Sequence, residues 1–83
     1  MKLNLFACSN GYLLTAECML PPMRAAEMYW PVSAKLGVVD GARLPEDVRT
    51  RVLGDVRARQ CAFVSAAEAF RLGLPQLAAA GKV

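Results

Sequence analysis

The chain has 83 residues, which is enough for one domain with a thin core, and we expect a single domain over residues 1–83. Its apolar content of 55% and charged content of 20% are typical of a globular chain and argue against intrinsic disorder. The net charge of +3 argues against a mimic of DNA, which needs a strongly negative surface, and is too small to indicate a nucleic-acid partner by itself.

The cysteines and the hydropathy pattern indicate where the chain works. Cys8, Cys18 and Cys61 are an odd number without the spacing of a disulfide framework, which predicts reduced thiols and a cytoplasmic location. Apolar runs are shorter than the roughly 18 residues of a membrane span, so we expect no membrane partner. Arginine and alanine are abundant, which favours a bacterial or phage genome rich in GC.

A β-hairpin at the N-terminus is the clearest local prediction. Residues 2–9 and 12–20 flank Asn10-Gly11, a dipeptide that tolerates the positive φ angles of a two-residue hairpin turn. A loop made of these two residues pairs Leu3 with Cys18 near the far end of the hairpin. Because side chains alternate across a strand, the pairing gathers one mostly apolar set of residues on a single face, and we expect this face to meet the core. The set is Leu3, Leu5, Ala7, Ser9, Tyr12, Leu14, Ala16 and Cys18.

The rest of the chain is predicted to alternate between helices and strands. In chain order, we expect a short helix over residues 23–30, a strand over 35–40, a helix over 45–59, a strand over 60–64, and a helix that begins at the Ser65 capping box and ends near Gly73. This order predicts an α+β fold. We expect an N-terminal β-hairpin in a small, mostly antiparallel four-stranded sheet, with two or three helices packed on one face.

The sequence offers little catalytic chemistry. It has no histidine, so a cysteine nucleophile would lack its commonest base. The acidic residues show no pairing typical of a glycosidase, the cysteine spacing matches no zinc motif, and the glycines form no phosphate-binding loop. We therefore expect a protein that is not an enzyme and that has no cofactor and no metal.

Two apolar groups are candidate partner-binding residues. Tyr29 and Trp30 are the densest aromatic point of the chain, and such residues dominate protein-interface hot spots. The alternative is that both rings anchor the short helix onto the sheet. Phe6, Cys8 and Leu13 form the second group, on the hairpin face opposite the expected core. The alternative there is that the C-terminal segment folds back and covers them.

Arg49 is a further candidate for partner binding. On the helix predicted over residues 45–59 it lies between Val56 and Leu53, within the apolar stripe. There it either extends to the rim of the core or reaches across an interface, where arginine is enriched.

The same helix carries the alternative function, because an arginine-rich helix can lie along a phosphate backbone. Helical spacing predicts an ion-pair ladder that neutralises two of its arginines, and Glu46 is placed to pair with Arg49. Arg43 and Arg57 are left as the nucleic-acid candidates. The ladder comprises Asp47, Arg51, Asp55 and Arg59.

These observations favour a non-catalytic protein-binding module. We expect a small bacterial or phage-encoded regulator or inhibitor that docks on a larger protein complex or self-associates as a homodimer. The alternative is a small basic nucleic-acid-binding protein that uses the arginine-rich helix.

Overall fold

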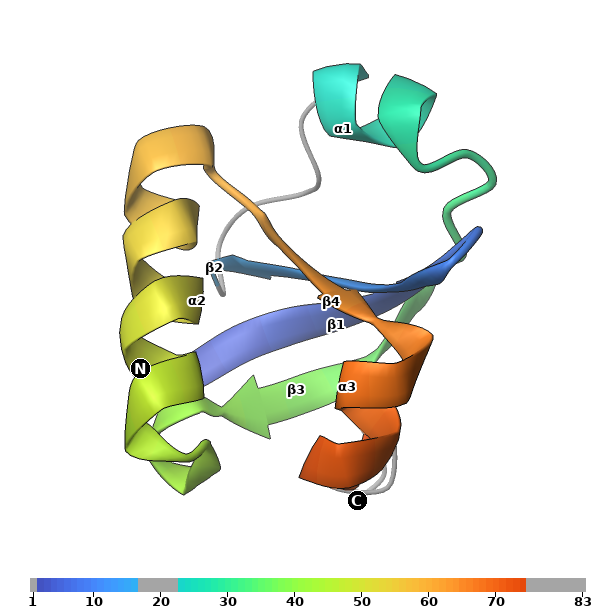
Figure 1. Cartoon of the computed structure of the whole chain (residues 1–83). Coiled ribbons are helices and arrows are strands. Elements are labelled where there is room, and N and C mark those ends of the chain that lie inside the picture. Colours follow the sequence, from blue (N-terminus) through green and yellow to red (C-terminus); the bar gives the residue numbers. More distant parts are fainter. Residues whose placement is uncertain (1, 17–22, 75–83) are drawn as a thin grey trace.

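The structure is a computed structural model that describes residues 2–16 and 23–74 of the chain. The elements follow one another along the chain in the order that the sequence predicts (Figure 1). They are β1 (Lys2–Cys8), β2 (Gly11–Ala16), α1 (Met23–Met28), β3 (Lys35–Asp40), the 3-10 turn η1 (Gly41–Arg43), α2 (Glu46–Arg59), β4 (Ala62–Ser65) and α3 (Ala66–Leu72).

The four strands form one sheet in the order β3-β1-β2-β4, and every neighbouring pair is antiparallel. The α+β class, the four-stranded antiparallel sheet and the N-terminal hairpin are therefore confirmed. The two strands of the hairpin lie at the centre of the sheet, and β3 and β4 lie at its edges. Each strand of the hairpin is therefore hydrogen-bonded to a neighbouring strand on both of its edges.

The hairpin turns one residue earlier than its sequence predicts. Cys8 pairs with Gly11 across a turn made of Ser9 and Asn10, and each residue of β1 pairs two positions earlier in β2 than expected. A shift of two positions keeps every side chain on its predicted face, because strand side chains alternate with a period of two. Leu3 accordingly pairs with Ala16, whereas its predicted partner Cys18 lies outside the described residues.

Gly11 has a structural role that differs from the one that the sequence suggests. Among the described residues, positive φ angles occur at Gln60 and Gly73, so the hairpin turn does not use the conformation that favours glycine. Gly11 instead lies where β2 and β4 approach most closely. A Cβ atom on it would lie 2.1 Å from the carbonyl oxygen of Val64 and 2.9 Å from the Cα atom of Ser65.

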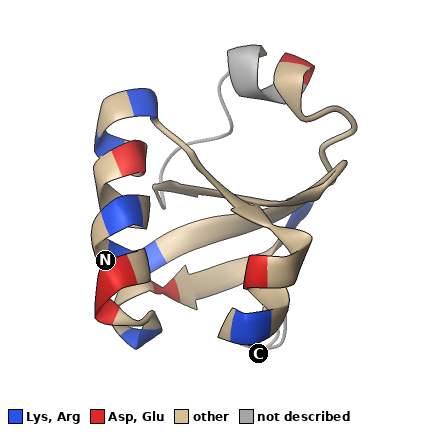
Figure 2. Ribbon diagram, viewed as in Figure 1, with Lys and Arg blue, Asp and Glu red and all other residues tan. Residues whose placement is uncertain are grey.

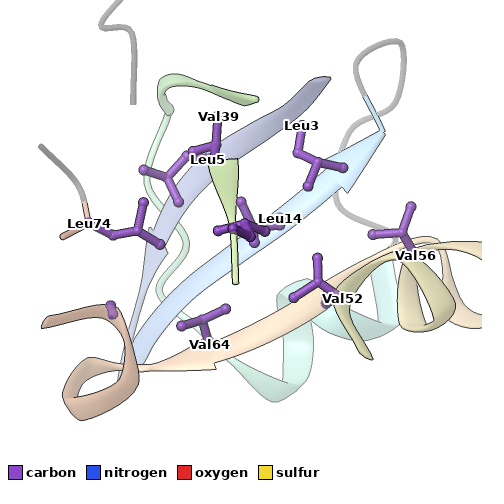
Figure 3. Packing of buried hydrophobic residues seen from close by; sticks show 11 residues of the cluster. Leu3, Leu5, Leu14, Val39, Val52, Val56, Val64 and Leu74 are labelled. Carbon is purple, nitrogen blue, oxygen red and sulfur yellow. The ribbon is translucent and has the colours of Figure 1, made fainter. Parts of the chain in front are cut away.

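One face of the hairpin forms the main hydrophobic core with α2 and α3 (Figure 3). Leu3, Leu5 and Leu14 are fully buried, as the predicted face requires. Valines spaced four residues apart along α2 pack against them, in agreement with the predicted apolar stripe. The other members of this cluster include Val39, Leu44, Val52, Val56, Ala62, Val64, Ala69 and Leu74.

The ends of α3 follow the expected capping chemistry. The Ser65 hydroxyl accepts a hydrogen bond from the Glu68 backbone N–H at 3.2 Å, and Gly73 ends the helix in the left-handed conformation with φ of 80°. α2 ends at Gln60, which adopts a φ of 68° without being glycine. These caps fix where the chain leaves each helix.

Replacing Gly11 by alanine is expected to destabilise the domain by about 1–3 kcal/mol, because the new methyl group collides with backbone atoms of β4 and the strands have to separate. Gly54→Ala is the matched control. Gly54 is in α2, and the position that a methyl group would take there has no atom within 4 Å, so alanine is expected to add roughly 0.5–1 kcal/mol through helix propensity. Urea unfolding of both variants measures the difference. A midpoint for Gly11→Ala at or above that of the parent chain would contradict this account.

Candidate binding surface

The second face of the hairpin is covered from within the domain. Phe6 and Leu13 are buried there, in a smaller cluster with several partly buried side chains. This corrects the prediction that Phe6, Cys8 and Leu13 form an open partner-binding patch, because Phe6 and Leu13 have almost no surface left for a partner. The side chains that pack against them are Cys8, Tyr29, Val32, Cys61 and Phe63.

The cover also differs from the one predicted. Tyr29 and Val32, from the connection between α1 and β3, supply it together with residues of β4 and its start. The C-terminal segment predicted for this role lies outside the described residues from position 75 on, and Leu74 packs in the main core on the other face.

Tyr29 anchors this connection through its ring. The ring stacks on that of Phe63 with the centroids 4.7 Å apart and the planes at 6°. Stacked aromatic pairs add about 0.5–1.5 kcal/mol to the free energy of burial alone. Tyr29 thus ties the end of α1 to the edge strand β4.

Backbone hydrogen bonds hold the same connection on both sides of Trp30. The carbonyl of Tyr29 accepts from the N–H of Ser9 at 3.2 Å. Beyond Trp30, the N–H of Ser33 donates to the carbonyl of Ala7 at 2.8 Å, and the Ser33 hydroxyl accepts from the N–H of Ala7 at 3.0 Å. The segment is therefore fixed to the turn end of the hairpin immediately before and shortly after Trp30.

Trp30 points out of this fixed segment. Its side chain is 71% exposed, and Met28, two residues earlier, is 67% exposed. We call Met28 and Trp30 the Trp30 surface. The sequence offers the same two alternatives for both rings, which are to anchor the short helix onto the sheet or to bind a partner. In the structure the two rings differ, because Tyr29 packs inward and Trp30 lies in solvent.

The two described cysteines do not combine into a site. Cys8 pairs with Gly11 at the turn end of the hairpin, whereas Cys61 precedes β4 near the opposite end of the same face. Burial raises the pKa of the Cys8 thiol above its ordinary value, against hydrogen bonds from the backbone of Asn10 and Gly11. The Cys8 thiol is therefore mainly protonated in neutral solution, and a protonated thiol is a poor nucleophile.

Cys61 has a different set of neighbours. Burial raises the pKa of its thiol, the charge of Arg59 opposes this rise, and the charge of Asp55 adds to it.

Over residues 2–16 and 23–74, histidine, cysteine, aspartate and glutamate nowhere gather in a group that could hold a metal ion. Within the same residues, every helix is too short or too polar to cross a bilayer.

The predicted ion-pair ladder along α2 does not form. Arg51 pairs instead with Glu68 on α3, at 2.6 Å, and joins the two helices. Arg49 is half-buried and makes no ion pair with Glu46.

The two nucleic-acid candidates, Arg43 and Arg57, are exposed. Basic and acidic positions are interspersed along α2 (Figure 2). Arg43 lies in η1, before the first residue of α2, and Arg57 lies in the last turn of α2. A helix of 14 residues is about 21 Å long, so the two guanidinium groups do not share one patch. Acidic Glu46 and Asp47 lie in the first turn of the helix, between them.

Sequence reasoning missed one exposed aromatic residue. Phe70 on α3 is 84% exposed, while Ala69 and Leu72 of the same helix pack on the main core. On a helical wheel of α3, Phe70 lies on the side away from Ala69 and Leu72. The helical spacing could therefore have predicted that its side chain is exposed. It lies across the sheet from Tyr29, because α3 packs on the face opposite the smaller cluster.

Comparison of the chain with protein-family models, with curated proteins and with solved structures finds no match. On the surface of the molecule, Trp30 combines an exposed aromatic ring with a backbone that is fixed on both sides.

Tyr29 and Trp30 are adjacent residues with opposite roles, and alanine substitutions separate them. Tyr29→Ala is expected to lower the free energy of unfolding by about 2 kcal/mol, because it removes the stacked ring from a packed cluster. Trp30→Ala is expected to change it by less than about 0.5 kcal/mol, as is usual for an exposed side chain. Urea unfolding measures both. Equal losses for the two variants would show that Trp30 packs inward in solution.

Proposed function

We propose that this chain is a protein-binding module that inserts Trp30 into a pocket of a partner protein. The observation that supports this most strongly is the exposure of Trp30 between two backbone anchors. A side chain that stays exposed on folding adds no burial free energy, so the Trp30 ring contributes little to the stability of the isolated chain. Tryptophan is also the residue most enriched among interface hot spots.

The fixed backbone supports binding in a second way. Association loses the freedom of every side chain and loop that becomes ordered in the complex. Because hydrogen bonds to Ser9 and Ala7 already hold the segment, this part of the entropy loss is small for the Trp30 surface. Met28 adds a flexible apolar side chain beside the ring, which adapts to the shape of a pocket.

The other predicted partner-binding residues have different roles in this proposal. Tyr29 positions Trp30 without touching the partner, and Phe6 and Leu13 belong to the interior. Arg49 belongs to α2, which packs on the opposite face of the sheet, and it lies outside the Trp30 surface. A domain of 83 residues with one such anchor suits a regulator or inhibitor that docks on a larger protein.

The test compares three immobilised proteins: the parent chain, Trp30→Ala and Phe70→Ala. Phe70→Ala is the matched control, since it removes another largely exposed aromatic ring, from the opposite face of the sheet. Each protein is incubated with bacterial lysate that has or has not been treated with nuclease, and the retained proteins are quantified by mass spectrometry. We expect a partner retained by the parent and by Phe70→Ala, but reduced at least about tenfold by Trp30→Ala, as for a hot-spot residue.

Nuclease treatment separates the alternative function. The protein-binding proposal predicts that nuclease leaves retention unchanged. Retention that disappears with nuclease, falls with salt and is weakened by Arg43→Ala or Arg57→Ala would favour nucleic-acid binding instead. A partner that Trp30→Ala retains in full would refute the proposed site.

A further inference from the structure

The outer edge of β3 is a second candidate interaction surface, separate from the Trp30 surface of the proposed function. β3 is an edge strand, so on one side its backbone has no neighbouring strand within the described residues. It has six residues, whereas β4 at the other edge has four. Exposed edge strands are templates for pairing with another chain.

The hydrogen bonds of Ala7 show which backbone groups of β1 point towards β3. Both its N–H and its carbonyl bond to Ser33, in the segment that leads into β3. Backbone groups alternate in direction along an antiparallel strand, so Leu5 and Leu3 also direct theirs towards β3. Their partners there are Gly37 and Val39.

It follows that the remaining groups of β3 face away from the sheet. Since Gly37 and Val39 direct their N–H and carbonyl groups to β1, those of Val38, which lies between them, point outwards. Leu36 is also 41% exposed, and Val38 is half-buried. Val38 therefore offers a backbone donor and a backbone acceptor at this edge, beside the apolar side chain of Leu36.

The two ends of this edge carry opposite charges. Lys35 and Asp40 are exposed, and neither makes an ion pair in the part of the chain that the structure describes. Lys2 lies opposite Asp40 on β1 but not within ion-pair distance. One carboxylate oxygen of Asp40 accepts from the N–H of Ala42 at 3.0 Å, which leaves its second oxygen for another donor.

A bulge in β3 makes these charges complementary to those of a second copy. Lys35 pairs with Phe6, Val38 with Asn4 and Asp40 with Lys2, so the extra residue lies between Lys35 and Gly37. On β1, Phe6 is the partner of Lys35 and Lys2 is the partner of Asp40. Each of them lies two positions from Asn4, the partner of Val38. Lys35 and Asp40 are thus equally distant from Val38 along the ladder and on the same face of the sheet.

We propose that two copies of this chain pair antiparallel through β3, about a twofold axis at Val38, and form one continuous eight-stranded sheet. Val38 of each copy donates to and accepts from Val38 of the other. At each end of the new ladder, Lys35 of one copy lies opposite Asp40 of its partner. The strand pairing leaves the Trp30 surface free, so the dimer is independent of the proposed binding function.

The test measures the mass of the full chain in solution by sedimentation velocity over a range of concentrations. A dimer is expected, and the dissociation constant is expected to rise at least about tenfold for Lys35→Asp and for Asp40→Lys, because each places like charges opposite each other. The double variant Lys35→Asp/Asp40→Lys is expected to recover most of the loss. This recovery separates charge pairing from simple misfolding.

Val38→Pro is a second variant, which tests the backbone pairing of the two β3 strands. The N–H that proline removes points away from β1, so the monomer loses no ladder hydrogen bond, while the dimer loses its central pair. Circular dichroism checks that the fold persists. Trp30→Ala is the control and is expected to dimerise like the parent. A parent chain that stays monomeric at millimolar concentration, a dimer unaffected by Val38→Pro, or a dimer that only Trp30→Ala disrupts would each overturn the proposal.

Discussion

The central hairpin has buried apolar side chains on both faces, and this constraint determines how the rest of the chain is arranged. Leu3, Leu5 and Leu14 face one side, and Phe6 and Leu13 face the other, all of them buried. A chain of 83 residues has few elements with which to cover both faces. The helices α2 and α3 contribute to the core on one face, whereas the connection before β3 covers the other with Tyr29 and Val32.

The proposed binding surface is a consequence of this cover. Tyr29 has to reach Phe63 to close the smaller cluster, and the chain then has to return to the hairpin at Ser33 to enter β3. Trp30 lies between these two fixed points, on a segment whose inward positions are already taken. The exposure of its ring is thus set by the packing of its neighbours, and replacing the ring by alanine leaves that packing in place. The edge strand β3, through which we propose that two copies pair, begins directly after this connection.

Much of the fold could be predicted from local chemistry. Turn and cap residues placed the hairpin, the strand Lys35–Asp40 and the start of α3 at Ser65, since these signals act within a few residues. The turn was misplaced by one residue because Gly11 serves a contact with β4, which is distant in sequence. The division of roles between Tyr29 and Trp30 depends on Phe63 for the same reason. Arg51 likewise pairs with α3 and not within its own helix, because tertiary packing brought Glu68 closer.

The most direct test of this account is the fluorescence of Trp30, which is the single tryptophan of the chain. Its emission and its quenching by acrylamide are measured in the native protein and in the urea-unfolded protein. The account predicts native emission at nearly the wavelength of the unfolded chain and quenching nearly as efficient, because the ring is already in solvent. Emission shifted to the blue, with protection from acrylamide that is lost on unfolding, would contradict it and place the ring in the interior.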